Sequence, residues 1–215
     1  IIYHTTDFGL NWTDETPSGT ALPGFPSLYS VMFGGGVWVA CGDASTTLLR
    51  SGGVWSRMSA PSFNQFEIFK DLTVIDGNNF VISGTDPQTS RPRIYRTTNA
   101  GVRWISIGPA SVPSGITDFP SNYFFNTTVG WIGTNLNYLG ATINSGNSWK
   151  QFQVAGMPSP SELHQMDFAD PLNGWAVGGD PAINEAWIIR YFGVPPKADI
   201  SLSQKAAVFP DVMCD

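Results

Sequence analysis

The chain has 215 residues, with 17 acidic and 11 basic side chains and a net charge of −6. Nucleic-acid-binding proteins need a basic face to neutralise phosphates, so this balance argues against that class. Only 13% of residues are charged, whereas glycine (23), proline (16) and tryptophan (8) are abundant. No segment reaches the roughly 18 consecutive apolar residues of a membrane span. The composition predicts a turn-rich β-protein rather than a helical bundle, with one domain or one domain plus a fragment.

A short polar box that ends in tryptophan recurs along the chain. Four segments align: TTDFGLNW (5–12), RSGGVW (50–55), TTNAGVRW (97–104) and TINSGNSW (142–149). Their glycines, Gly9, Gly53, Gly101 and Gly146, are 44, 48 and 45 residues apart. A fixed period of this size is typical of propellers and solenoids.

A second marker has nearly the same period. It is a strand-like segment with one aromatic residue, found in GVWVACG (36–42), NNFVISG (78–84), GWIG (130–133) and NGWAVGG (173–179). The aromatic residues Trp38, Phe80, Trp131 and Trp175 are 42, 51 and 44 positions apart. The segments between turns are short, aromatic and β-branched, and no dozen residues hold a helical stripe. Each period therefore has room for about four antiparallel strands, which is one blade of a β-propeller.

The residue types of the box fit a tight hairpin turn. An Asp or Asn can accept hydrogen bonds from the turn that follows it, and a Thr hydroxyl can support the same turn. Glycine supplies a positive φ, and the tryptophan at the start of the next strand can bury its ring against a neighbouring sheet. We therefore predict structural roles for Thr5, Asp7, Gly9, Trp12, Ser51, Gly53, Trp55, Thr97, Asn99, Gly101, Trp104, Thr142, Asn144, Gly146 and Trp149.

These boxes resemble the Asp-box, or BNR, repeat of sialidases, sortilin-type receptors, xyloglucan-cleaving hydrolases and photosystem-assembly factors related to Ycf48. The first box matches the full pattern, the third and fourth carry Asn for Asp, and the second is degenerate, with Ser51 at the acidic position and Trp55 one residue early. The segment MDFADPLNGWAVGG (166–179) resembles the Ycf48-like version in particular. Similar repeats occur in secreted surface proteins of Bacteroidetes exported by type IX secretion. The resemblance implies an all-β propeller fold in which the boxes are structural.

The repeats predict a domain boundary near residue 193. Residues 1–17 supply a last hairpin, three fuller repeats follow, and Ser161 to Gly193 begins another blade without a box. Either the first hairpin completes the last blade and closes a small ring, or upstream blades are missing, and we favour the second because open sheet edges are costly. Residues 1–193 are thus expected to be the C-terminal part of a larger ring with four to five blades visible. Residues 194–215 are expected to be a proline-containing linker and the start of a following β-domain.

The chain offers few candidates for chemistry. Two carboxylates facing each other across a cleft would suit a glycosidase, and the strand-adjacent acids are Asp43, Asp71, Asp167 and Asp180. Asp43 and Asp180 follow equivalent strands, which indicates either a paired site or a turn residue that the repeat reuses, and we favour the turn. The arginine run Arg91, Arg93 and Arg96 cannot all face one cavity, as a sialidase would need.

The sequence also gives no positive indication of a metal or cofactor site. His4 and His164 stand in unrelated repeat positions without ligands at metal-binding spacing, so we predict neither metal nor cofactor. Two interpretations of the cysteines stay open: a disulfide between Cys41 and Cys214, or a buried free thiol at Cys41, which the usual burial of cysteine favours.

The sequence favours a non-catalytic binding or spacer module of a large secreted or surface-anchored bacterial protein, not an enzyme. We expect a protein or glycan ligand, no nucleic acid and no membrane span. One alternative is a sialidase-like or xyloglucanase-like hydrolase with its catalytic residues largely outside this segment. A second alternative, implied by the resemblance, is a membrane-complex assembly factor of the Ycf48 type.

Overall fold

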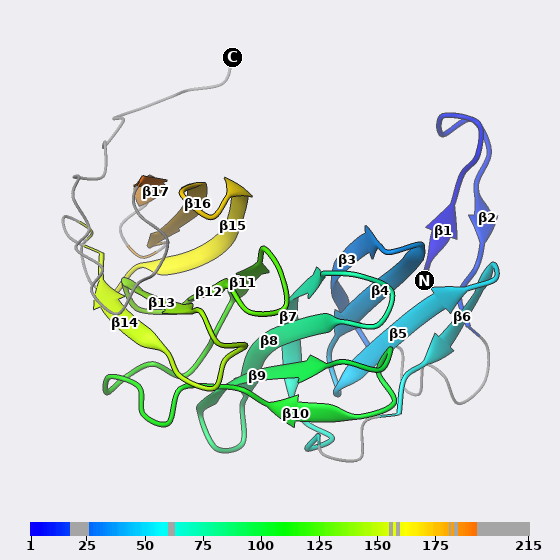
Figure 1. The fold of residues 1–215 in the computed structure, drawn as a ribbon. Coiled ribbons are helices and arrows are strands. Elements are labelled where there is room, and N and C mark those ends of the chain that lie inside the picture. Colours follow the sequence, from blue (N-terminus) through cyan, green and yellow to red (C-terminus); the bar gives the residue numbers. More distant parts are fainter. Residues whose placement is uncertain are drawn as a thin grey trace.

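The structure is a computed structural model that describes residues 1–17, 26–59, 63–154, 157, 160–180, 182 and 185–192. Four small antiparallel sheets follow one another along the chain like propeller blades, after an N-terminal hairpin (Figure 1). The prediction of an all-β propeller built from four-stranded blades is confirmed. Among the described residues there is no helix that could cross a membrane. The predicted linker and following domain at 194–215, together with Cys214, lie outside the described residues.

In each sheet the strands pair in chain order, from the inner edge of the blade outward. The hairpin consists of β1 (Tyr3–His4) and β2 (Thr13–Asp14). Blade 1 contains β3 (Leu28–Gly34), β4 (Val37–Gly42), β5 (Thr46–Ser51) and β6 (Val54–Arg57). Blade 2 contains β7 (Ile68–Val74), β8 (Phe80–Asp86), β9 (Arg91–Thr97) and β10 (Trp104–Ser106). Blade 3 contains β11 (Ser121–Phe124), β12 (Gly130–Gly133), β13 (Tyr138–Thr142) and β14 (Lys150–Gln153). Blade 4 contains three described strands, β15 (Glu162–Asp170), β16 (Asn173–Asp180) and β17 (Glu185–Phe192).

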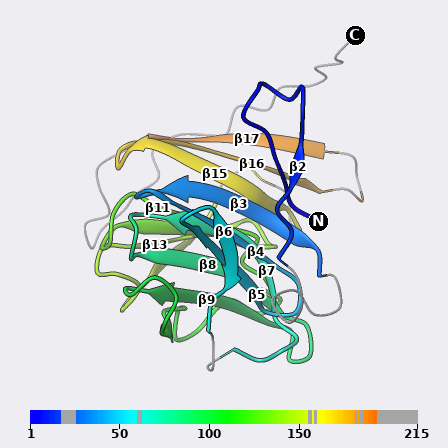
Figure 2. The ribbon, with the colours of Figure 1, turned by 90° about the vertical axis from the view of Figure 1, so that its right-hand side faces the viewer.

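The four blades curve around a common opening that their innermost strands line. Strand β7 packs between β3 and β11, and β11 packs between β7 and β15. Figure 1 shows these inner strands facing the opening, with β6, β10 and β14 on the periphery. The hairpin β1–β2 stands out beyond blade 1, as the perpendicular view also shows (Figure 2). It forms its own two-stranded sheet and does not pair with β17, so in the described part of the chain it does not complete blade 4.

The apolar core lies between the blades. Val39 and Cys41 of blade 1 meet Leu72 and Ile82 of blade 2 in one buried cluster. Similar clusters join blades 2 and 3, and blades 3 and 4. Cys41 is a free thiol, and burial together with nearby Asp71 raises its pKa well above the usual range. Burial of these faces is the main favourable contribution to folding, so each blade depends on its neighbours.

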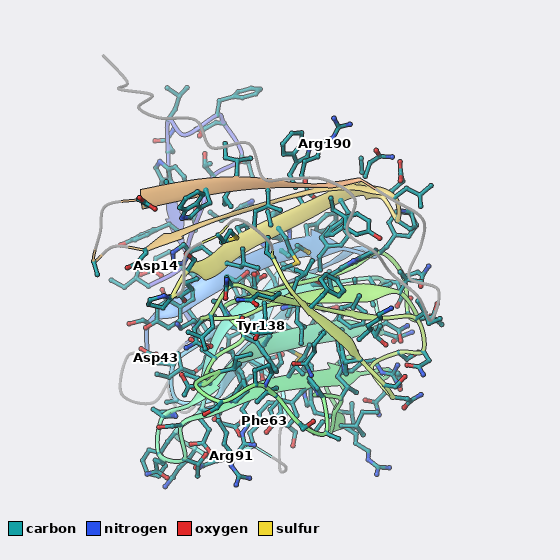
Figure 3. The ribbon with its side chains drawn as sticks, turned by 90° about the vertical axis from the view of Figure 1, so that its left-hand side faces the viewer. Asp14, Asp43, Phe63, Arg91, Tyr138 and Arg190 are labelled. Carbon is teal, nitrogen blue, oxygen red and sulfur yellow. The ribbon has the colours of Figure 1, made fainter. Side chains whose placement is uncertain are left out.

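The repeated aromatic residues report which blade faces are covered. Phe80 and Trp131, in the two middle blades, are fully buried, and Trp131 stacks on Phe168 of blade 4 with ring centroids 4.0 Å apart. Trp38 and Trp175, in the first and last blades, are exposed. The guanidinium of Arg190 lies 5.5 Å from the Trp175 ring centroid, and this side chain stands on the outer side of blade 4 (Figure 3). Blades 1 and 4 therefore each have one uncovered apolar face.

A buried carboxylate joins three blades. Asp71 of β7 accepts hydrogen bonds from the Leu72 amide (2.8 Å), the Ser30 hydroxyl of blade 1 (3.3 Å) and the Asn122 amide of blade 3 (2.9 Å). Asn122 in turn accepts a bond from Thr73. Burial raises the pKa of Asp71 to about 6, although the bonds it accepts act in the opposite direction. Asp71, a candidate catalytic acid by sequence, is thus enclosed within a joint between blades.

This joint predicts a pH dependence of stability. Between about pH 4 and pH 6 the folded chain holds a proton on Asp71 that the unfolded chain has released, so stability falls as pH rises. Asp71→Asn should remove this component. The unfolding free energy of the variant minus that of the parent should therefore rise by about 3 kcal/mol between pH 4 and pH 7. Urea unfolding at several pH values measures this difference.

A matched control is Asp167→Asn, because Asp167 makes the same local bond to the next amide but is exposed. Comparing the two variants separates the loss of the bonds that Asp71 makes between blades from the loss of any carboxylate with this local bond. If both variants follow the pH profile of the parent, Asp71 does not hold the proton that its burial implies.

Candidate functional site

Three inner strands carry an irregularity at the same place. The pairing of β3 with β4, of β7 with β8 and of β15 with β16 each shifts by one residue, at Tyr29, Lys70 and His164. A β-bulge of this kind re-aims a side chain and is common next to functional sites. The irregularities thus place a phenol, an ammonium and an imidazole at corresponding points around the opening.

Ion pairs connect these side chains across the blades. The Lys70 ammonium of blade 2 pairs with Asp118, just before β11, and with Glu162 of β15, whose Oε1 is 3.5 Å away. His164 Nδ1 lies 3.8 Å from the same Glu162 oxygen. Because Lys70 and Glu162 belong to blades that are not neighbours, their contact crosses the inner surface of the propeller.

Burial and charge act against each other in this cluster. Burial raises the pKa of Asp118, and pairing with Lys70 only partly offsets it. Burial lowers the pKa of Lys70, but its two carboxylate partners outweigh this and the net shift is upward. Asp118 is 6% exposed, and its second oxygen, Oδ1, is buried without a hydrogen-bond partner. A buried carboxylate oxygen of this kind is costly unless something pairs with it.

Tyr29 extends the same group of residues to blade 1. Partial burial and a hydrogen bond to the Asp43 carboxylate raise the pKa of the Tyr29 hydroxyl, while nearby Lys70 lowers it. We call Tyr29, Asp43, Lys70, Asp118, Glu162 and His164 the rim cluster. It contains three carboxylates and one lysine, so with neutral histidine it carries a net charge of −2.

The structure does not gather the four candidate catalytic acids into one site. Asp43 lies in the β4–β5 turn, where its carbonyl accepts the Thr46 amide, and Asp180 Oδ1 accepts the Ala182 amide beyond β16. Asp71 is enclosed as described above, and Asp167 binds its neighbouring amide. The equivalent positions of Asp43 and Asp180 therefore correspond to a turn residue that two blades reuse.

The arginines are engaged separately. Arg93 pairs with Asp86 at 2.8 Å and with buried Glu67 at 3.1 Å, inside blade 2. Arg96 donates to the Ser145 carbonyl of the next blade. Arg91 stands at the far edge of the molecule from Arg190 (Figure 3). This dispersal differs from the arginine cluster that would clamp a carboxylate.

The boxes beginning at Thr5, Thr97 and Thr142 share one hydrogen-bond pattern. In each, the threonine oxygen accepts the amide of the box glycine at 3.0 Å. The threonine hydroxyl donates to the Asp or Asn side chain at 2.8 to 3.0 Å. That side chain also accepts the amide four residues further along, at 2.9 Å in all three boxes. Each turn is therefore closed by its own side chains.

The backbone of these turns has a feature that the sequence did not reveal. The glycines have positive φ, as expected, at +87° for Gly9, +82° for Gly101 and +81° for Gly146. The residue before each glycine is also left-handed, at +58° for Phe8, +52° for Ala100 and +64° for Ser145. Such a φ is unfavourable for residues with a Cβ, so the side-chain bonds must stabilise it.

The degenerate second box forms a shorter turn than the other three. Ser51 pairs directly with Val54, and the two residues between them, Gly52 and Gly53, both have positive φ. This is the two-residue hairpin that consecutive glycines favour. Here the glycine pair supplies the conformation that side-chain bonds support in the other boxes.

The box tryptophans differ in burial. Trp104 is 3% exposed and packs near Phe63, Trp55 is buried, and Trp149 is half-buried with its ring N–H donating to the Ile107 carbonyl. Trp12, which we expected to bury its ring, is 59% exposed, and its ring N–H donates to the Gly9 carbonyl of its own turn. That expectation is wrong for Trp12 because no described neighbouring sheet covers this hairpin.

Removing the box side chains should destabilise the fold unequally. Asn99→Ala and Asn144→Ala leave turn groups without partners and should each cost about 1–3 kcal/mol. Ser51→Ala, in the turn that glycines close, should change stability by less than about 0.5 kcal/mol. Urea unfolding of the three variants measures these values. Equal losses at all three positions would contradict a specific role for the carboxamides.

The tryptophans supply a second series. Trp104→Ala should cost about 3–5 kcal/mol, because it empties a packed site between blades. Trp12→Ala should cost less than about 1 kcal/mol, because most of its ring is already in water. Thermal melting of both variants tests this, and a larger loss at Trp12 would show that its ring is covered in solution.

Neither a protein-family profile nor a curated protein sequence matches the chain. Solved structures do match, at low identity. Ycf48 from Cyanidioschyzon merolae aligns with a TM-score of 0.64 and 14% identity over 88% of this chain and 60% of that chain. A Ycf48 bound to a D1 peptide aligns at 0.50 with 15% identity, covering 78% and 66%. The GH74 xyloglucanase from Xanthomonas campestris aligns at 0.62 with 13% identity, covering 86% and 33%. The chain thus spans less than two thirds of each of these proteins and shares with them the β-propeller fold.

Proposed function

We propose that this chain is a non-catalytic binding module, secreted or displayed at a cell surface, whose ligand site is the rim cluster. The observation that carries the proposal is the recurrence of one bulge in three inner strands, which presents Tyr29, Lys70 and His164 at the same opening. Packing alone does not require polar residues at these three positions. The low charge content and the many aromatic residues support the extracellular setting.

The charge of the cluster indicates the chemistry of the ligand. Three carboxylates face one lysine, so the site favours a positively charged group over an anion. Glu162 is partly exposed and supplies an accessible acceptor for such a group. A lysine or arginine side chain on a protein segment fits both features. The similar Ycf48 that was solved with a D1 peptide gives a precedent for peptide binding by this fold.

The same geometry weighs against hydrolysis. A glycosidase needs one carboxylic acid and one carboxylate free to act on opposite sides of a glycosidic bond. Asp118 and Glu162 instead both pair with the Lys70 ammonium that lies between them. The xyloglucanase likeness concerns the fold, so hydrolysis stays a rival that the experiment below addresses.

The test is a peptide array of basic, neutral and acidic sequences. We expect basic peptides to bind, with affinity that falls as salt rises, because the interaction is electrostatic. Glu162→Gln should weaken this binding about tenfold, as the loss of one charged contact implies. Asp180→Asn, which removes a carboxylate from the blade 4 turn outside the cluster, is the matched control and should bind like the parent.

Two outcomes would overturn the proposal. One is a preference for acidic peptides that is lost in Lys70→Met, which would make the lysine the recognition element. The other is hydrolysis of chromogenic glycosides that Asp118→Asn or Glu162→Gln abolishes, which would make the chain an enzyme.

A further inference from the structure

The N-terminal hairpin has the register of the outer half of a blade. In blades 1, 2 and 3, the amide just after the fourth strand donates to a carbonyl in or beside the third strand. These bonds are Met58 to Thr47 (2.9 Å), Ile107 to Ile94 (3.1 Å) and Val154 to Asn137 (2.7 Å). In the hairpin, the Glu15 amide donates to the Ile2 carbonyl at 2.9 Å. Strands β1 and β2 therefore occupy the third and fourth positions of a blade.

The two inner positions of that blade are open in the described structure. Strand β1 pairs with β2 on one side, and its other edge has no partner strand among the described residues. On β3 beyond the bulge, alternate residues face this side, and Val31 and Phe33 are each more than half exposed. The corresponding strand β7 has β3 beside it, and its residues from Asp71 to Val74 are all buried. The exposed side of β3 is thus a blade interface without its neighbour.

A groove marks the empty place. It has a volume of about 380 Å³ and lies between the hairpin and blade 1, with apolar walls formed by Ile2, Tyr3, Leu28, Val31, Trp38 and Ala40. It is continuous with an existing contact, because Ile2 and Leu28 already pack on the buried cluster of Ala40, Leu48 and Trp55. Exposed apolar surface of this kind marks an interaction site.

The charged groups of the groove are already paired with one another. Arg50 makes two hydrogen bonds to the Glu15 carboxylate, at 2.7 and 2.6 Å. His4 Nδ1 lies 3.3 Å from the same carboxylate. The hydrogen bond and charge of Arg50 hold the pKa of Glu15 below its usual value. With these groups engaged, the groove offers an apolar wall and a strand edge, which suits a polypeptide better than a sugar.

We propose that this groove binds a two-stranded antiparallel β-element that is apolar on the side that faces β3. Its outer strand pairs with the free edge of β1, and its inner strand lies beside β3 as β3 lies beside β7. Main-chain hydrogen bonds to β1 and burial of Val31, Phe33 and Trp38 stabilise the complex, which is the physics of β-strand addition. This binding role is separate from that of the rim cluster, with which the groove shares only Tyr29.

The chain itself supplies the probe. The Ile2 carbonyl accepts the same hydrogen bond in the hairpin as the Ile94 carbonyl accepts in blade 2. Ile1 therefore corresponds to Arg93, the residue before Ile94. A copy of residues 68–92, containing β7 and β8, fused directly before Ile1 therefore places two inner strands at the groove. We expect the fusion to melt at a higher temperature than the parent chain.

Two controls make the result specific. A fusion in which Thr73 and Val81 of the added copy are replaced by Asp has the same length but disrupts the face of β7 and β8 that meets the following blade, and should melt like the parent. Val31→Asp should leave the melting temperature of the unfused chain nearly unchanged, since Val31 is 59% exposed, but should abolish the gain in the fusion. A fusion that melts no higher than its Asp-bearing control, or a gain that survives Val31→Asp, would overturn the proposal. Oligosaccharide binding by the parent chain that Trp38→Ala abolishes, with no gain in melting temperature for the fusion, would instead identify a sugar pocket.

Discussion

The fold depends on neighbouring blades that bury the two faces of each innermost strand. A blade of four short strands is too small to bury an apolar core within itself, so its two faces must be shielded by the blades on either side. Strand β7 shows the satisfied case, because both of its faces are buried between β3 and β11. Strand β3 shows the unsatisfied one, with alternate residues in water. Stability is therefore a property of neighbouring pairs of blades, as in other repeat proteins.

The inner strands also carry the polar groups that distinguish this chain from a generic propeller. On β7, Asp71 is turned into the joint between blades, whereas the preceding residue, Lys70, is turned to the opening and its carboxylate partners. The irregular pairing at this point is what separates the two directions. One strand thus stabilises the assembly and presents a charged surface within two consecutive residues.

The sequence predicted what is local and periodic. The boxes predicted the hairpin turns and the positive φ of their glycines, because the residues that close each turn lie within eight positions of one another. The contacts of Lys70 with Asp118 and Glu162 could not be predicted, since they depend on bulges that shift the alternation of β7 and β15 and on the curvature of the whole arc. The exposure of Trp12 was missed for a related reason. Burial of a box tryptophan depends on a neighbouring sheet, which the box itself does not encode.

The closure of each box by its own side chains has a consequence for the order of folding. The Gly101 amide donates to the Thr97 oxygen, and the Thr97 hydroxyl donates to Asn99. These bonds span two to four residues, so this hairpin can form on the microsecond scale without help from the rest of the chain. The joint between Asp71 and Asn122 closes a loop of 51 residues and must wait for two blades to form. We therefore expect the outer hairpins to act as early local nuclei, with the inner strands assembling onto them blade by blade.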